Sequence, residues 1–551
     1  MSKRKLRIGL LMNGPVVHAW IYRVLERLAA SGGAEIALVI YKESPPPRGL
    51  RELWVRRRRG VYFLFDLLDR RLFRRPDSAF ARVDASELLA GVPVLTVRPR
   101  QQGYLEEIEE AELEKIRGGD LDILIRFGFQ VLAGGILGAA RYGVWSHHHG
   151  DNRSYRGGPP GFWEVVRGTP VTGSILQLLN EELDGGQILC RSWSLTDWLS
   201  PTRNREHLFW SSSSFLPRQI ERLHRMGAEA FFASVAGKNP PFSFYDRPMY
   251  RVPANLEALG LVVRHGVRVA ARSLRKCLYR DQWWLMFALS EQIPTSLRRY
   301  RAIAPPKDRF WADPHLVYRQ GKYYIFVEEL VYRNRRAHIS VLEMDEAGNY
   351  TAAVPVLERP YHLSYPFVFE WEGTWYMVPE SSGNGTVELY ECVEFPHRWR
   401  FRMNLMQGVR AVDATLHYAD GRWWLFAALA EHPRSSIHTE LCLFSSPELF
   451  TDRWTPHPEN PIVSDARNAR PAGRIFAQDG RLYRPAQNCS GRYGRGFNLN
   501  EITLLTQTEY REERVVSVEP NWRPGMTATH TLSREHRLCV IDALMSRRKF
   551  F

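Results

Sequence analysis

Short apolar runs separated by polar turns dominate the first 200 residues. The runs that predict buried strands cover residues 6–12, 35–41, 92–97 and 121–125. Helical spacing of apolar residues follows the first run over residues 16–30 and precedes the last run over residues 104–117. Strands that alternate with helices in this way predict an open, doubly wound α/β domain.

Aromatic and polar positions alternate after residue 300, and a glycine turn recurs between two strands. The turn glycines are Gly321, Gly373, Gly421 and Gly480, which lie 52, 48 and 59 residues apart. Hairpins that repeat about every 50 residues are typical of β-propeller blades. The segment SREHRLCVIDAL from Ser533 predicts one more hairpin without the glycine. We therefore expect an all-β propeller of five blades.

Prolines and one long amphipathic pattern mark the segment between the two halves. Pro240, Pro241 and Pro253 indicate a linker, and residues 256–279 have the spacing of an amphipathic helix. We therefore expect three parts. They are a domain over residues 1–215 with a basic insertion at about 45–90, a helical linker over 216–300 and the propeller over 301–551.

Positive charge is concentrated in two segments. The formal net charge is +15, and +12 of it lies within Arg51–Arg75 and residues 261–300. A basic stripe at intervals of four residues runs along the predicted helix and consists of Arg264, Arg268, Arg272 and Lys276. Arg51–Arg75 and Arg264–Lys276 are each expected to form either a solvated helix face or a contact with an anionic membrane surface.

Composition and cysteine usage restrict the class of protein. With 44% hydrophobic and 25% charged residues, the chain is neither collagen-like nor mucin-like nor wholly disordered. Its six cysteines form no CxxC pair, which indicates reduced thiols. The N-terminus predicts no signal peptide, and no run of about 18 uncharged apolar residues predicts a membrane span. We expect a cytoplasmic protein, either free or peripheral to a membrane.

Three histidines stand at the end of a predicted strand, where open α/β sheets bind ligands. They are His147, His148 and His149, and Asp184 follows in a Leu-Asp-Gly-Gly turn. A histidine and a carboxylate at the strand ends of one sheet predict a general acid/base pair. Because consecutive strand residues point to opposite faces, we do not expect the histidines to bind one metal ion.

A longer pattern surrounds this pair. It consists of Gly143, His148, Arg156, Gly157, Pro160, Thr172, Gly173 and Asp184. With the upstream segment DILIRFGFQVLAGGIL it resembles the catalytic core of the 10-formyltetrahydrofolate-dependent formyltransferases, over roughly residues 5–200. The resemblance implies that His148 and Asp184 are catalytic and that 10-formyltetrahydrofolate is the donor. It also implies cofactor-binding residues Arg126, Phe127, Gly128, Phe129, Gln130 and Leu183, and substrate-binding residues Arg156, Gly157 and Thr172.

Ser146 departs from the formyltransferase pattern, which has asparagine at this position. In that family the asparagine donates a hydrogen bond to the oxyanion that forms when an amine attacks the formyl carbon. The loss of one such donor costs about 10²–10³ in rate. We expect Ser146 to face the oxyanion, with His147, His149 and Asn152 as the alternatives.

The second half carries the segments RFWADPHL, RWWLF and LYRPAQNCSGRYGR. They resemble the N-terminal module of plant glucosamine inositolphosphorylceramide transferases and, more distantly, five-bladed glycosidases of the arabinanase and invertase type. In those glycosidases, carboxylates from successive blades meet in a central funnel as base, modulator and acid. The residues expected in the funnel here are Asp313, Glu380, Asp413, Arg470 and Gln487. In the plant module the chemistry belongs to a separate domain, which implies a sugar-facing or scaffolding role for the propeller.

These observations predict an N-formyltransferase with a carbohydrate-related propeller. The donor is 10-formyltetrahydrofolate, and the acceptor is an amine on a nucleotide-linked or lipid-linked sugar. A methionyl-tRNA formyltransferase-like enzyme is one alternative, although we expect no nucleic-acid partner because the C-terminal barrel of that enzyme is missing. A glycoside-processing propeller is another alternative. The last one is a glycan-binding or membrane-surface scaffold with an inert formyltransferase fold.

Overall fold

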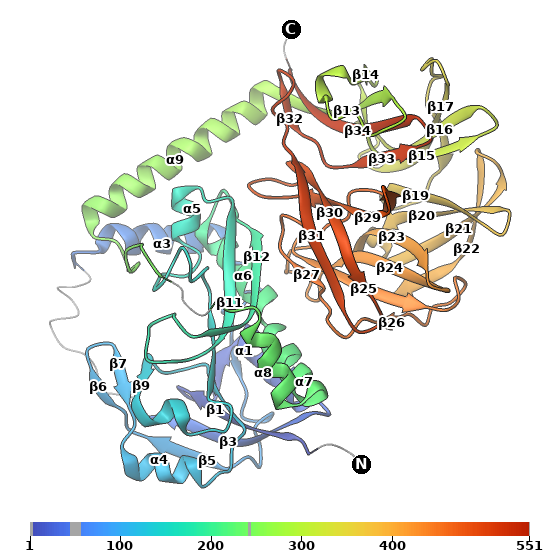
Figure 1. Ribbon diagram of the computed structural model, residues 1–551. Coiled ribbons are helices and arrows are strands. Elements are labelled where there is room, and N and C mark those ends of the chain that lie inside the picture. Colours follow the sequence, from blue (N-terminus) through green and yellow to red (C-terminus); the bar gives the residue numbers. More distant parts are fainter. Residues whose placement is uncertain (1–3, 44–56, 241–243, 550–551) are drawn as a thin grey trace. The chain divides into compact units, whose positions relative to one another are not determined.

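The computed structural model describes residues 4–43, 57–240 and 244–549 (Figure 1). Residues 51–56 of the expected basic segment and Pro241 of the expected linker therefore lie outside the described residues. The chain divides into two compact units, Met1–Val269 and Ala270–Phe551. The predicted linker over 216–300 is not a separate part, because its first half packs on the first unit and its second half joins a propeller sheet.

The described part of the first unit contains a sheet of seven strands. Their order is β12 (Gln187–Leu195), β11 (Val171–Leu178), β10 (Val144–His148), β8 (Ile123–Arg126), β1 (Leu6–Met12), β3 (Ala34–Lys42) and β5 (Val94–Val97). The five strands from β10 to β5 are parallel, whereas β11 and β12 are antiparallel. The expected α/β fold is confirmed, with an antiparallel edge that the sequence pattern did not reveal.

Helices cover both faces of this sheet (Figure 1). The larger apolar core joins one face to α1 (Ala19–Ala29), α6 (Pro201–Ser212), α7 (Phe215–Met226) and α8 (Ala228–Ala236). The core on the other face includes residues of α4 (Glu110–Arg117) and the 3-10 turn η1 (Gly134–Gly138). The remaining helices are α3 (Gly60–Phe73), α5 (Trp163–Arg167) and α9 (Asn255–Leu278).

Two predicted helices are shorter than expected because small sheets replace their first turns. The short strands are β2 (Val16–His18), β4 (Arg82–Asp84), β6 (Arg100–Gln102), β7 (Leu105–Glu107) and β9 (Val131–Ala133). β2 pairs with β4, and β7 pairs with β6 and β9. Long-range strand pairing therefore overrides the helical spacing at residues 16–18 and 105–107.

The amphipathic character of α3 is inverted. Its buried face carries two carboxylates: Asp66 Oδ1 accepts from Arg205 at 2.6 Å, and Asp69 Oδ2 accepts from the Thr202 amide at 2.8 Å. Its exposed face carries the apolar side chains Phe63, Leu64, Leu67, Leu68 and Leu72, of which Leu72 is 75% exposed. None of the described helices is long and apolar enough to cross a membrane. An exposed apolar helix face of this kind marks an interaction surface.

The described part of the second unit consists of five antiparallel sheets, which are the five expected blades. The first four are β15 (Arg309–Arg319) to β18 (Val354–Leu357), β19 (Ser364–Trp371) to β22 (Arg398–Gln407), β23 (Ala411–Ala419) to β27 (Val463–Ser464), and β28 (Phe476–Gln478) to β31 (Tyr510–Val518). Within them lie β16 (Lys322–Val331), β17 (Ala337–Asp345), β20 (Thr374–Ser381), β21 (Thr386–Glu394), β24 (Arg422–Leu429), β25 (Glu440–Ser446), β26 (Thr455–Pro456), β29 (Arg481–Asn488) and β30 (Gly496–Leu505).

The fifth blade combines strands from both ends of the unit. It contains β13 (Tyr279–Leu289), β14 (Arg301–Ile303), β32 (Met526–Ala528), β33 (Leu532–Glu535) and β34 (Leu538–Arg548). The predicted hairpin from Ser533 is the β33–β34 pair, and β13 pairs with β34 along its whole length. β13 falls inside the predicted linker, where its role in the propeller was not expected.

A bulge recurs at the first strand of three successive blades. Asp313, Tyr365 and Asp413 have φ values of 49°, 42° and 53°, and the register of each hairpin shifts at that point. Bulges of this kind re-aim side chains and are frequent next to functional sites. The three side chains are buried within the propeller.

Candidate active site

A histidine and an aspartate form a pair at the C-terminal end of β10. His148 Nδ1 lies 3.2 Å from Asp184 Oδ1, and His148 Nε2 lies 3.0 Å from the carbonyl oxygen of Tyr155. Both neighbours accept hydrogen bonds when Asp184 is ionised, so the geometry suits an imidazole with a proton on each nitrogen. The structure thus brings together the two residues that were predicted to be catalytic, in an arrangement that can hold and release a proton.

Backbone contacts fix the carboxylate of Asp184 in its turn. Asp184 adopts φ 54°, a left-handed conformation that aspartate tolerates better than most residues. The Gly157 amide donates to Asp184 Oδ2 at 2.9 Å, and Asn152 Nδ2 donates to the Asp184 carbonyl oxygen at 3.1 Å. Gly157 has φ 90°, and a Cβ at this position would lie 2.2 Å from the carbonyl oxygen of Tyr250.

Substitution of Gly157 by alanine is expected to destabilise the first unit by about 1–3 kcal/mol, because a Cβ meets backbone and the left-handed conformation is strained. Urea unfolding of the variant measures the loss. Gly138→Ala is the matched control, since nothing lies within 4 Å of a Cβ at Gly138. Equal stability of the two variants would contradict this role of Gly157.

His147 and His149 point to the opposite face of the sheet. His147 Nε2 lies 3.1 Å from the Ser212 carbonyl oxygen, and His149 Nε2 lies 2.9 Å from Ser212 Oγ. Burial lowers the pKa of His147 to about 4 and that of His149 well below its usual value. Both are therefore neutral core side chains. They are not candidates for the oxyanion contact that was considered for them.

A guanidinium and a hydroxyl occupy the position that was expected to face the oxyanion. Ser146 is in register with Arg126 on β8, and Arg126 Nε donates to Ser146 Oγ at 2.9 Å. Arg126 also donates to the carbonyl oxygen of Gln130. Burial lowers the pKa of Arg126, while the charges of Asp184 and Glu106 act in the opposite direction. A cationic donor thus lies beside Ser146, at the position where the formyltransferase pattern has asparagine.

The loop that follows β8 contains the residues predicted to bind the cofactor. Phe129 has φ 65°, and its amide donates to Asn13 Oδ1 at 3.1 Å. A Cβ on Gly128 would lie 2.6 Å from the same oxygen, so the loop passes close to the turn after β1. Phe127 packs on the core at the edge of the sheet, and Leu183 is partly exposed. Contact with folate stays a prediction for these residues.

The predicted substrate-binding residues have different surroundings. Arg156 is buried; its guanidinium forms an ion pair with Glu182, and its Nε donates to the Asn152 carbonyl oxygen at 3.0 Å. Thr172 points to the face opposite His148, and its Oγ1 lies 2.8 Å from Thr196 Oγ1. The structure gives Thr172 an internal role in place of the predicted substrate contact.

Most funnel carboxylates of the propeller are already satisfied by protein donors. Arg470 donates to both oxygens of Asp413, and Gln487 Nε2 donates to Asp413 Oδ2 at 2.9 Å. Glu380 accepts from Ser364 Oγ at 2.9 Å and from the Ser382 amide at 2.8 Å. A general acid must be free to give its proton to a substrate. The arrangement therefore favours binding or structural roles for Glu380 and Asp413, in line with the expected sugar-facing or scaffolding role of the propeller.

Asp313 belongs to a second charged group in the propeller. His530 lies between two carboxylates, with Nδ1 2.5 Å from Asp542 Oδ2 and Nε2 3.4 Å from Asp313 Oδ1. The three side chains also offer atoms close enough together to hold a metal ion. Burial alone lowers the pKa of His530, but the charges of Asp542 and Asp313 outweigh it and raise this pKa to about 9. At neutral pH the positive charge of a protonated His530 offsets the charge of Asp542, while burial raises the pKa of Asp313 well above its usual value.

Stability of the chain is expected to fall as pH rises from about 6.5 to about 9. The pKa of His530 is higher in the folded state than in the unfolded state. The protonated side chain therefore contributes fully to the free energy of unfolding below pH 6.5, and this contribution is lost as the pH rises through the folded pKa of about 9. Urea midpoints at several pH values measure this slope. His530→Gln should flatten it, whereas His417→Gln should not, because the pKa of His417 is lowered by burial. An unchanged slope in His530→Gln would contradict the assignment.

Comparisons with known proteins match the two halves separately. Residues 299–547 match the family described as glucosamine inositolphosphorylceramide transferase 1, N-terminal. The rice glucosamine inositolphosphorylceramide transferase 1 (Oryza sativa subsp. japonica) is 35% identical over 208 residues, which are 37% of this chain and 27% of that protein. The methionyl-tRNA formyltransferase of Chlorobium limicola is 29% identical over 108 residues, which are 19% of this chain and 33% of that protein. The first half of this chain is thus similar to methionyl-tRNA formyltransferases, and the second half matches the N-terminal module of glucosamine inositolphosphorylceramide transferase 1.

The chain spans only about a third or less of the length of these relatives. Among solved structures, the GH62 α-L-arabinofuranosidase domain of Coprinopsis cinerea has a TM-score of 0.35 at 12% identity and covers 48% of this chain and 97% of its own.

Gln177 is a further site residue of the formyltransferase-like domain, and sequence reasoning missed it. Gln177 on β11 is in register with Ser146, so Arg126, Ser146 and Gln177 form a row across three adjacent strands. The side chain of Gln177 is buried, and its Oε1 has no hydrogen-bond partner. A buried acceptor without a donor fits a ligand that brings an N–H or O–H group. Only the pairing of β10 with β11 reveals this position.

Proposed function

We propose that the chain is an N-formyltransferase. It moves the formyl group of 10-formyltetrahydrofolate to an amine on a sugar-containing acceptor that is nucleotide-linked or lipid-linked. The observation that carries the proposal is the pair of His148 and Asp184 in a formyltransferase-like domain. The free Oε1 of Gln177 fits a ligand that brings an N–H or O–H group to this pair.

His148 and Asp184 manage the proton of the reaction. The donor supplies a formyl carbon that the amine attacks, and it leaves as tetrahydrofolate. The neutral imidazole keeps its hydrogen bond to Asp184 and presents the other nitrogen as a base. The proton that it takes from the amine is then stabilised by the Tyr155 carbonyl oxygen, 3.0 Å from His148 Nε2. The same proton passes to the departing nitrogen.

Arg126 and Ser146 stabilise the negative charge that develops on the formyl oxygen. Arg126 Nε and Ser146 Oγ are 2.9 Å apart, and both lie on the sheet face of His148. Buried donors that are fixed before the reaction stabilise such a charge more strongly than water does. A cation in this position is stronger than the neutral amide of the family pattern.

The first test is calorimetric titration of the whole chain with 5-formyltetrahydrofolate, which resembles the donor but does not transfer its formyl group. We expect micromolar binding that weakens when Gly128 is replaced by valine, because that side chain collides with Asn13 and displaces the loop that is predicted to contact the folate. Absence of binding at millimolar ligand would remove the formyltransferase proposal.

We further propose a cytoplasmic protein whose α3 and α9 contact an anionic membrane surface. The exposed apolar face of α3 is flanked by exposed Arg70, Arg71 and Arg74. α9 exposes an apolar stripe at helical spacing, formed by Leu256, Leu259, Val263, Val267, Leu274 and Leu278. Apolar stripes beside basic residues are typical of helices that lie in the membrane interface. One arginine of the predicted stripe, Arg268, instead donates to carbonyl oxygens at the end of α5.

The triple variant Leu64→Gln, Leu67→Gln, Leu72→Gln is expected to reduce binding to phosphatidylserine-containing vesicles by at least about tenfold, since each exposed leucine contributes about 1 kcal/mol or more on insertion. Vesicle pelleting measures the bound fraction. Val393→Gln with Val515→Gln is the matched control on exposed apolar residues of the propeller. Equal binding of both variants and the unmodified chain would contradict the membrane surface.

A further inference from the structure

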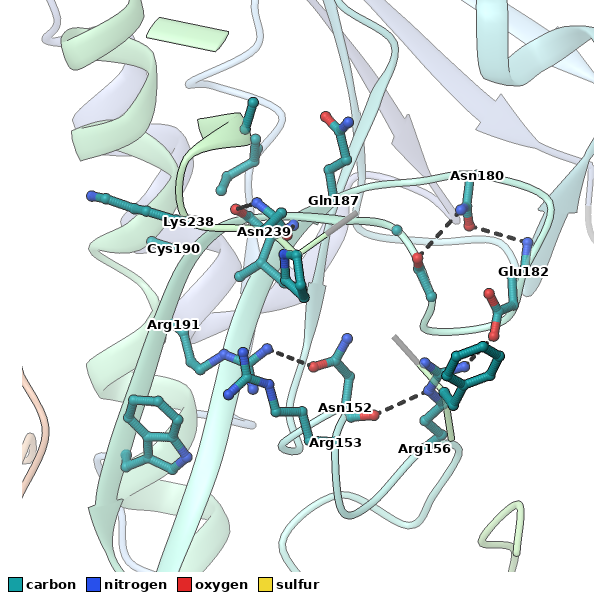
Figure 2. Close-up of a pocket in the computed structure, with 18 residues that line it drawn as sticks. Asn152, Arg153, Arg156, Asn180, Glu182, Gln187, Cys190, Arg191, Lys238 and Asn239 are labelled. Atoms are coloured by element: carbon teal, nitrogen blue, oxygen red, sulfur yellow. Dashed lines mark hydrogen bonds and ion pairs between the residues drawn. The ribbon is translucent and has the colours of Figure 1, made fainter. Parts of the chain in front are cut away.

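A cavity of about 870 Å³ lies against Asn152, Arg153 and Arg156 (Figure 2). Its walls are β12, the loops over residues 152–156 and 180–186, and the segment that follows α8. This volume is within the range of small-molecule sites. The cavity lies entirely within the formyltransferase-like domain, and neither His148 nor Asp184 is among its described lining residues.

Cations dominate the walls of this cavity. The cationic side chains are Arg153, Arg156, Arg191 and Lys238, and the only acidic one among the described lining residues is Glu182. Figure 2 shows Arg153 and Arg191 side by side. Burial lowers the pKa of Arg191, and the charge of Arg153 lowers it further. The charge of Asp151 raises this pKa and offsets the charge of Arg191, so the charge of Arg153 is the one available to an anionic ligand.

The arginines differ in how they are held. Arg191 Nη2 donates to Asn152 Oδ1 at 2.8 Å, and Arg191 also forms an ion pair with Asp151. Its orientation is therefore fixed before any ligand binds. The guanidinium of Arg153 makes no hydrogen bond or ion pair with any described residue, and its side chain is exposed. One fixed and one adjustable guanidinium suit the tetrahedral oxygens of a phosphate group.

Asn152 connects this wall to the catalytic pair. Its Oδ1 accepts from Arg191, and its Nδ2 donates to the carbonyl oxygen of Asp184 at 3.1 Å. A ligand bound through Arg153 and Arg191 thus lies against the residue that holds Asp184. Trp193 adds an apolar ring at the same wall, 5.5 Å from the Arg191 guanidinium carbon. Aromatic rings beside cations are well suited to a phosphorylated sugar.

We infer that this cavity binds the phosphate group of the acceptor, which makes the acceptor a phosphorylated amino sugar. That the bound sugar is the formyl acceptor rests on the proposed formyl transfer. The phosphate site itself does not depend on that proposal. The fixed guanidinium of Arg191 and the adjustable guanidinium of Arg153 bind the phosphate, and the amine points toward His148.

Calorimetric titration of the whole chain with glucosamine 1-phosphate tests the site. We expect binding that is at least tenfold tighter than that of glucosamine and that weakens with added salt. Arg153→Gln should weaken the binding of glucosamine 1-phosphate at least tenfold. It should leave the fold intact, because the guanidinium of Arg153 makes no hydrogen bond or ion pair with any described residue. Arg141→Gln is the control; this arginine is half-exposed outside the cavity and pairs with the exposed Asp120 and with the buried Asp122, which Arg4 also contacts. Equal binding of glucosamine and its phosphate, or no effect of Arg153→Gln, would overturn the inference.

Two further outcomes separate this inference from the proposed function. If glucosamine 1-phosphate binds through Arg153 while 5-formyltetrahydrofolate does not bind at all, the phosphate site stands and formyl transfer fails. If Arg153→Gln instead weakens only 5-formyltetrahydrofolate that carries several glutamates, the cavity takes carboxylates of the folate tail. That result overturns the acceptor site and leaves formyl transfer in place.

Discussion

Replacement of Asp184 by asparagine is expected to lower kcat for formyl transfer by about 10²–10⁴. Both carboxylate oxygens accept hydrogen bonds, one from His148 Nδ1 and one from the Gly157 amide. An asparagine offers only one acceptor, so its amino group must face either the imidazole or the Gly157 amide. In either orientation the charge that stabilises the imidazolium is lost. The rate of tetrahydrofolate formation under saturating substrates measures the effect.

Asp120→Asn is the matched control for this substitution. Asp120 and Asp184 both have positive φ, at 44° and 54°, so the backbone strain of the change is the same. Asp120 is on the surface, in ion pairs with Arg4 and Arg141. Its variant should keep the full rate. If Asp184→Asn also keeps the full rate while 5-formyltetrahydrofolate still binds, His148 does not act through Asp184.

Replacement of Arg126 by glutamine is expected to lower kcat by about 10²–10³, which is the usual cost of one donor to a developing negative charge. The KM for the donor should change much less, because the stabilised charge exists only during the reaction. Separate measurement of kcat and KM therefore distinguishes this role from the cofactor-binding role predicted for Arg126.

Rescue by the family residue provides a second readout. Ser146→Asn in the Arg126→Gln background restores an amide donor at the family position and should recover part of the lost kcat. Arg141→Gln controls for the loss of a positive charge. A fall in donor affinity with unchanged kcat would mean that Arg126 only binds the folate.

The sequence predicted the strands of the sheet and the pair of His148 and Asp184, because apolar runs and a dense motif are local signals. It did not predict β13 as a propeller strand, since that role depends on pairing with residues 249 to 269 positions later. The direction of His147 and His149 followed from strand alternation, yet their neutral packing depends on α6.

The group of His530, Asp313 and Asp542 in the propeller was likewise predicted only in part. Asp313 was expected in the funnel from its position in the repeat, and it is buried there. His530 and Asp542 were not expected, because neither stands in a recognisable motif and only the folding of the last blade brings them to Asp313. Gln177 was missed for a similar reason, since a register between two strands cannot be read from either strand alone.

The pairing of β13 with β34 has a consequence for gene fusion and domain exchange. The recognised family begins at residue 299, but a crossover there would remove the strand that completes the last blade and would expose the edge of β34. A crossover within α9, before Tyr279, leaves that blade whole. The boundary at which either half can be recombined with another domain therefore lies within α9, upstream of the segment that matches the family.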